Sequence, residues 1–302
     1  MVTMTEELEL SNLELQVDNG GGGSWEYLSL VRKLRVRRSD KVLKHGLPIL
    51  RDSKKRSALG SEQWTLCEQV AVAAMDCQCL DIAKECVNEL QIQFPNSKRV
   101  GKLKGMLLEA QGLWEEAENV YTSLLEDNPT DQMVHKRKVA IAKSQGRVTK
   151  AIECLIKYLD TFMADHDAWR ELAELYISRQ MYKQAAFCYE ELILHQPTEP
   201  LYHLSYAEVL YTLGGLDNIV MAKKYYSSTI DLTGGKNTRA LLGICLCNSA
   251  IHHMTNGKYK EGKDCPDLQS LASAALEKDY KQKASKMLPL LTSALKSLHV
   301  SS

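Results

Sequence analysis

The sequence lacks several features that would assign it to a common class of protein. Its longest apolar run, Ala240 to Cys247, is far shorter than the roughly 20 residues that a membrane-spanning helix needs. Lysine plus arginine (38) equals aspartate plus glutamate (38), so no net charge attracts nucleic acid to the whole chain. The nine cysteines contain no Cys-x-x-Cys pair. This usage indicates reduced, packed thiols in the cytosol or nucleus.

Basic residues are absent from the first 19 positions, which carry five acids. No basic segment leads into an apolar core there, so we expect no signal peptide. Four glycines follow at Gly20–Gly23, without the Gly-Lys-Ser/Thr of a phosphate-binding loop. We therefore expect residues 1–23 to form a disordered, acidic and glycine-rich tail.

A period of 34 residues runs through the centre of the chain. Small residues, prolines and glycines recur at this spacing, which is typical of tetratricopeptide (TPR) repeats. In the repeat at 166–199, Trp169, Leu172 and Tyr176 lie at helical spacing, and Pro197 is placed to end the second helix. The periodic residues are Ala83, Ala117, Ala151 and Ala185, then Pro95, Pro129 and Pro197, with Gly112 and Gly146.

The predicted fold is all-α, a right-handed superhelical solenoid of TPR-type helical hairpins. We expect basic N-terminal capping helices at 24–60 and an array of about five to six repeats at 61–255. A loop and C-terminal capping helices should follow at 256–302. Five repeats are assigned to 64–97, 98–131, 132–165, 166–199 and 200–236. In the last of these, Gly214–Asn218 is expected to lengthen the turn between helices.

No set of residues predicts catalysis, a cofactor or a resident metal, so we expect no enzyme. Cys245 and Cys247 with His252 and His253 match no common zinc spacing, although a metal site there stays an alternative. A second open alternative concerns the eleven lysines and arginines between positions 31 and 56. They favour either a solvated face of the capping helices or a patch for RNA or anionic lipid headgroups.

Function is expected in the groove of the solenoid, which the first helix of each repeat lines. The residues in groove-lining positions are basic in repeats two and three and acidic toward repeats four and five. A chaperone-tail clamp would need a lysine and asparagine pattern that Lys102, Met106 and Arg137 do not supply. The candidate partner-binding residues are Arg99, Lys102, Lys136, Lys143, Arg170, Glu174, Glu208 and Tyr211.

From about Trp25 to Cys247 the chain resembles the family of subunit 2 of the endoplasmic reticulum (ER) membrane protein complex, most closely in a plant-type form. The inserted glycine turn with the segment before it, Tyr206-Ala207-Glu208-Val209, is the most diagnostic part. The other segments that carry the resemblance are Phe94–Val100, Leu125–Thr130, Lys136–Lys138, Ala168–Ile177, Ala185–Cys188 and Glu190–Leu192.

The resemblance implies a non-enzymatic scaffold, held peripherally on the cytoplasmic face of the ER membrane without a transmembrane helix. Such a subunit would cradle cytosolic parts of membrane subunits 3 and 5 and bind soluble subunit 8 or 9. The complex would insert tail-anchored and multi-pass proteins, and no nucleic-acid partner is expected. The alternative from another class is a soluble TPR adaptor in RNA processing or protein turnover.

Overall fold

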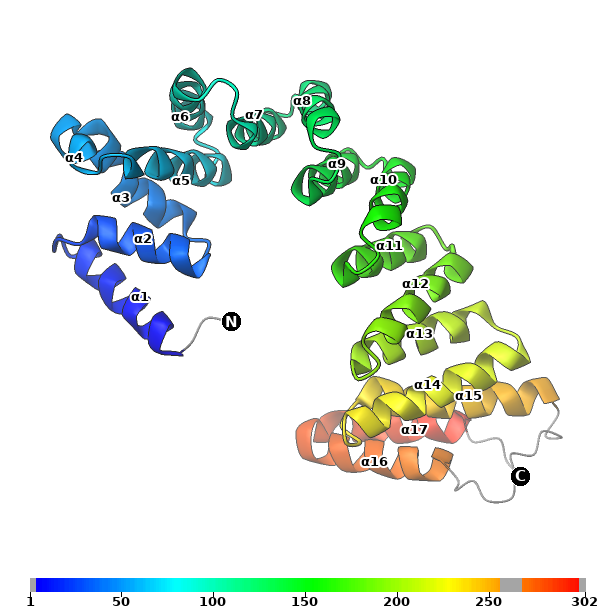
Figure 1. Ribbon diagram of the computed structural model, residues 1–302. Helices are drawn as coiled ribbons and strands as arrows, with labels where there is room; N and C mark the ends of the chain where they lie inside the picture. The colour runs from blue at the N-terminus through cyan, green and yellow to red at the C-terminus, as the bar shows by residue number, and fades with distance from the viewer. Residues whose placement is uncertain (1–3, 256–267, 299–302) are drawn as a thin grey trace. The chain divides into compact units, whose positions relative to one another are not determined.

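The computed structural model describes residues 4–255 and 268–298, and every regular element in these ranges is a helix (Figure 1). The loop expected at the start of 256–302, at Gly257–Pro266, therefore lies outside the described residues. The helices form two compact units, residues 1–147 and 148–302.

The N-terminal unit stacks its helices in chain order, and α4 is a short helix beside α3. Its core is centred on Tyr27, Leu28, Leu66 and Val70, all fully buried. The helices are α1 (Met4–Asp18), α2 (Ser24–Leu34), α3 (Ser39–Arg51), α4 (Ser53–Ala58), α5 (Glu62–Asp76), α6 (Leu80–Gln93), α7 (Lys98–Ala110), α8 (Trp114–Asp127) and α9 (Gln132–Ser144).

The C-terminal unit continues the same arrangement of consecutive antiparallel hairpins. Leu155, Leu192 and Ile244 are fully buried in it. The elements are α10 (Val148–Thr161), α11 (His166–Ser178), α12 (Tyr182–His195), α13 (Pro200–Leu213), α14 (Leu216–Leu232), α15 (Thr238–Thr255), α16 (Leu268–Lys283), the short 3₁₀ helix η1 (Ser285–Met287) and α17 (Leu288–Leu298).

The 34-residue period of the sequence is the period of the helices, which confirms the predicted class of fold. First helices begin at Lys98, Gln132, His166 and Pro200. Second helices keep the same spacing, and Ala83, Ala117, Ala151 and Ala185 are completely buried in them. Because an alanine has no side chain beyond Cβ, it lets two helix backbones approach closely. The second helices begin at Leu80, Trp114, Val148, Tyr182 and Leu216.

A residue with a positive φ recurs with this period between the two helices of a repeat. Gln78, Gly112, Gly146, Gln180 and Gly214 all have a positive φ, between 58° and 74°. Glycine adopts this region without a steric penalty, whereas glutamine does so at a cost. A positive φ is therefore kept even at the two positions that carry glutamine, although Gly214, with ψ −175°, is extended rather than left-handed.

The expectation of a longer turn in the fifth repeat is wrong. Only Gly214 and Gly215 separate α13 from α14, and both have a positive φ. The additional residues instead extend the second helix, since α14 has 17 residues and α12 has 14. Ala222, fully buried, takes the place of the small residue one turn further along. A glycine pair makes this possible because it reverses the chain within two residues.

The prediction of a disordered tail at residues 1–23 is also contradicted, for the part from Met4 to Asp18. Residues 4–18 form α1, which packs beside α2 and buries Leu10 and Val17. The composition suggested disorder because an acidic segment has few apolar groups of its own. What orders it is a set of basic partners further along the chain, on α3.

Candidate functional site

A groove of about 750 Å³ is hollowed into the N-terminal unit. Helices α2, α3, α5, α7, α8 and α9 contribute to its wall, which we call the arginine groove. Its apolar lining includes Val36, Val72, Met106 and Trp114. Six arginines and three carboxylates also line it: Arg32, Arg35, Arg37, Arg38, Arg99 and Arg137, with Glu68, Asp76 and Glu109.

Each carboxylate of the arginine groove is held by an arginine of another element. Arg37 Nε donates to Asp76 at 2.8 Å, and Ser39 donates to the same carboxylate. The Arg37 guanidinium lowers the pKa of Asp76 below its ordinary value, so this carboxylate stays charged at neutral pH. The other pairs are Arg99 with Glu68 at 2.8 Å and Arg137 with Glu109 at 3.4 Å. The groove acids are thus paired, and Arg32 and Arg38 pair with Glu62 and Glu14 outside the lining.

Arg35 is the groove arginine that is open to a ligand. It ends α2 in the left-handed conformation, with φ 53°, and its backbone N–H bonds to the last turn of the helix. Its side chain is exposed, and within the described part of the chain no carboxylate forms an ion pair with it. A guanidinium in this setting is available to a carboxylate from another molecule.

Of the four candidate residues in the N-terminal unit, Arg99 lines the arginine groove. Lys102 pairs instead with Asp131 at 2.6 Å, and Asp131 also caps α9 by accepting from the N–H of Val134. Burial opposes ionisation of Asp131, but the lysine and the backbone N–H lower its pKa overall. Lys102 therefore ties α7 to α9. Lys136 and Lys143 are exposed on α9 and do not line the groove.

The four candidates in the C-terminal unit are not gathered in one hollow. Arg170 pairs within its own helix with Asp167, and Glu174 is exposed on α11. Glu208 pairs with Arg239 at 2.7 Å, which links α13 to α15. Tyr211 is half-buried on α13, and burial raises its pKa.

Sequence reasoning missed a second hollow, of about 560 Å³, between α10, α11 and α12. Its lining is mostly apolar, and Met163 and Phe187 are 63% and 54% exposed there. Trp169 stacks edge-on against Phe187 at a centroid distance of 6.1 Å. The sequence did contain a signal for this hollow. Ile156 on α10 and Phe187 on α12 are large apolar residues outside the helix faces that bury Ala151 and Ala185. Exposed apolar surface of this kind marks an interaction site.

The basic stretch at 31–56 is extensively paired with the chain's own acids. Arg32 pairs with Glu62 and Arg56 with Glu89, at 3.2 and 2.6 Å. Further partners lie on α1, and Arg37 holds Asp76. These contacts reduce the free positive charge that an RNA-binding surface would need. The basic residues bound by carboxylates of α1 are Arg38, Lys41, Lys44 and His45.

The alternative metal site does not assemble. Across residues 4–255 and 268–298, no three histidine, cysteine or acidic side chains lie close enough to hold an ion. Cys245 and Cys247 are fully buried, whereas His252 and His253 are exposed. Burial raises the pKa of Cys247 to about 12, which disfavours the thiolate that a metal needs.

No helix within the described ranges is both long enough and apolar enough to span a bilayer. Repeated helical hairpins, an arginine groove and an exposed apolar hollow define a tetratricopeptide-type repeat protein with surfaces suited to other polypeptides. A solved structure agrees on the fold: the C-terminal part of a TPR repeat-containing protein from Cytophaga hutchinsonii matches with a TM-score of 0.59. That match has 13% identity and covers 87% of this chain and 97% of the other.

Sequence comparisons give the particular family. A protein-family model described as "EMC2 TPR-like repeat domain" matches residues 82–215. ER membrane protein complex subunit 2-A of Xenopus laevis is 41% identical over 251 residues, covering 82% of this chain and 83% of the relative. Subunit 2 of Dictyostelium discoideum is 34% identical over 238 residues, covering 77% and 74%. The chain belongs to the family of ER membrane protein complex subunit 2.

Proposed function

We propose that this protein is a non-enzymatic scaffold subunit of the ER membrane protein complex. It would hold cytosolic segments of membrane-embedded subunits and so support insertion of tail-anchored and multi-pass proteins. Family membership supports a place in the complex. The proposed partners are subunits 3 and 5 in the membrane and the soluble subunit 8 or 9, with the protein on the cytoplasmic face.

The arginine groove is the observation that carries this proposal. Its exposed Arg35 suits a carboxylate, while Met106 and Trp114 offer apolar contacts in the same lining. An acidic segment that also carries large apolar side chains would complement both properties. A repeat array is largely preformed, so such a segment loses little binding energy to rearrangement of the scaffold.

The test is to purify the tagged full-length protein from detergent-solubilised microsomes and identify what accompanies it by mass spectrometry. A stoichiometric set of membrane subunits is expected for the wild type. The groove variant Arg35→Glu with Arg99→Glu should lose affinity for its partner segment by about tenfold or more, because like charges in an interface cost several kcal/mol.

The matched control is Lys33→Glu with Arg51→Glu, which makes the same change of charge at exposed positions outside the groove. The control should recover the wild-type set of subunits. Equal recovery by the groove variant would refute the assignment of the groove. Recovery of RNA-processing or degradation factors without membrane subunits would support the alternative adaptor and refute the scaffold.

A further inference from the structure

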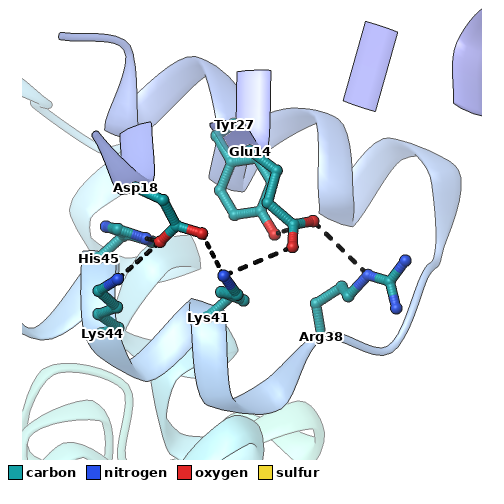
Figure 2. A network of polar contacts seen from close by, with 7 residues as sticks. All are labelled: Glu14, Asp18, Tyr27, Arg38, Lys41, Lys44 and His45. Carbon is teal, nitrogen blue, oxygen red and sulfur yellow. Dashed lines mark hydrogen bonds and ion pairs between the residues drawn. The ribbon is translucent and has the colours of Figure 1, made fainter. Parts of the chain in front are cut away.

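The acidic helix α1 lies outside the 34-residue period and is held to the rest of the N-terminal unit by its charges. Asp18 accepts from Lys44 at 2.6 Å and from Lys41, and His45 Nε2 lies 3.2 Å from the same carboxylate (Figure 2). These three residues belong to α3. The lysines lower the pKa of Asp18 below its ordinary value, so the contact is ionic at neutral pH.

One turn earlier on α1, Glu14 makes a second set of contacts with the same surface. It accepts a hydrogen bond from the Tyr27 hydroxyl at 3.2 Å. Lys41 lies 3.6 Å and Arg38 3.7 Å from its carboxylate. Lys41 therefore bridges both acids of α1. Glu14 and Asp18 point from one helix toward one basic face (Figure 2).

Apolar contacts complete the same face of α1. Leu10 and Val17 are buried, and Leu13 packs partly against the core. Residues at intervals of three and four lie on one side of a helix, so this face alternates apolar and acidic groups. The acids Glu7 and Glu9 are both exposed: Glu9 lies on another side of the helix, and Glu7 lies one turn before Leu10, outside the buried part of this face. The contact face of α1 consists of Leu10, Leu13, Glu14, Val17 and Asp18.

The connection between α1 and α2 is suited to detachment of α1 from the α2–α3 face. Asn19 to Gly23 separate the two helices, and Gly20 and Gly23 have positive φ. An isolated helix of 15 residues is marginal in water, so α1 depends on its contacts with α2 and α3. Its opposite side exposes a further apolar stripe, Met4, Leu8 and Leu15.

From this geometry we infer that the α2–α3 face under α1 is a docking site for an acidic amphipathic helix, and that α1 occupies it in place of a partner. The complementary charges of Glu14 and Asp18 with Arg38, Lys41 and Lys44 define the chemistry of that partner. Its helix carries apolar residues at i, i+3 and i+7 and carboxylates at i+4 and i+8, as α1 does from Leu10 onward. This inference does not depend on the arginine groove or on the complex proposed above.

The site is tested with full-length protein and a fluorescent, helix-stapled peptide of the sequence Met4–Asp18, followed by fluorescence anisotropy. In the wild type the tethered α1 competes at an effective concentration on the order of 1 mM. The release variant Glu14→Lys with Asp18→Lys repels α3 and removes this competitor. If the Kd of the uncovered face for the peptide is about 0.1 mM, the apparent Kd of the release variant should be about tenfold lower than that of the wild type.

The control variant Glu7→Lys with Glu9→Lys changes the charge of α1 equally, but on exposed positions, and should bind the peptide like the wild type. Adding Lys41→Glu and Lys44→Glu to the release variant should abolish binding. The single-face variant Lys41→Glu with Lys44→Glu should instead bind a peptide in which Glu14 and Asp18 are lysine, which keeps the test informative if the release variant folds poorly.

Three outcomes would overturn the inference. The first is a release variant that binds no more tightly than the wild type, together with no binding of the lysine-containing peptide to the Lys41→Glu, Lys44→Glu variant. The second is an equal gain in the Glu7 and Glu9 control. The third is a release variant that binds vesicles of phosphatidylcholine and phosphatidylserine but not the peptide, which would assign the face to a lipid surface.

Discussion

Replacing Gly105 by alanine tests the close packing of α7 on α8, which positions one wall of the arginine groove. A Cβ at Gly105 would lie 2.4 Å from Cε1 and 2.6 Å from Cζ of Tyr121. Carbon atoms prefer about 3.5–4.0 Å, so the ring would have to move by about 1 Å. Tyr121 is fully buried and its hydroxyl donates to Glu109, so packing and this hydrogen bond both oppose movement of the ring.

Two opposing terms set the magnitude. Alanine is about 1 kcal/mol better than glycine inside a helix. Overpacking a filled core costs about 1–3 kcal/mol, and the short contacts with a fixed ring place Gly105→Ala at the upper end. We expect a net loss of about 1–2 kcal/mol in the free energy of unfolding. Gly101→Ala on the same helix is the matched control, because the nearest atom to its Cβ is a methyl carbon of the flexible Leu124 side chain, at 3.0 Å. It should be neutral, or stabilising by up to about 1 kcal/mol.

Urea unfolding followed by circular dichroism measures the global effect of Gly105→Ala. Amide hydrogen exchange of α7 and α8 measures the local one, since a repeat array need not unfold in a single step. In a Tyr121→Leu background the ring is gone, and Gly105→Ala should then cost nothing. An equal cost in both backgrounds, or a Gly105→Ala variant as stable as the wild type, would refute the steric argument.

Three further predictions concern other parts of the chain. Ala185→Leu should lower the free energy of unfolding of the C-terminal unit by about 2 kcal/mol in urea, because Ala185 is fully buried. Lys41 depresses the pKa of Asp18 in the folded protein. The ionised Asp18 carboxylate therefore contributes to stability above its unfolded-state pKa of about 3.9, and this contribution is progressively lost as pH falls below that value. The protection of α1 amides against hydrogen exchange, relative to the unfolded chain at the same pH, should therefore fall below about pH 4 before that of α5. Cys188 and Cys247, whose burial raises each pKa to about 12, should resist iodoacetamide at pH 8 until urea is added.

The helices could be predicted from the sequence because their signals are local. A buried alanine, a turn residue and a proline recur within each repeat, and each acts on its immediate neighbours. The fifth repeat shows the limit of this reasoning. Gly214 and Gly215 correctly indicated an altered turn, but the pattern did not show that the additional residues would be helical.

The candidate site was predicted less well because its geometry depends on residues far apart in the chain. Arg99 was identified and does line the arginine groove. Lys102 has the same charge and lies one turn away, yet its partner Asp131 caps α9, the first helix of the next repeat. The period alone does not distinguish a lysine that ties two repeats together from one that faces a ligand. Arg35 was missed because it lies before the repeats begin.

The neighbour-to-neighbour packing of the N-terminal unit has a consequence for how the protein is made. His45, the last of the residues that hold Asp18, lies 27 positions after it. Synthesis at about 5–20 residues per second produces that interval in about one to five seconds. The acidic helix can thus close over α3 while most of the chain is still being translated. A newly synthesised subunit would therefore leave the ribosome with α1 already covering the α2–α3 face. A partner helix could bind this face only by displacing α1.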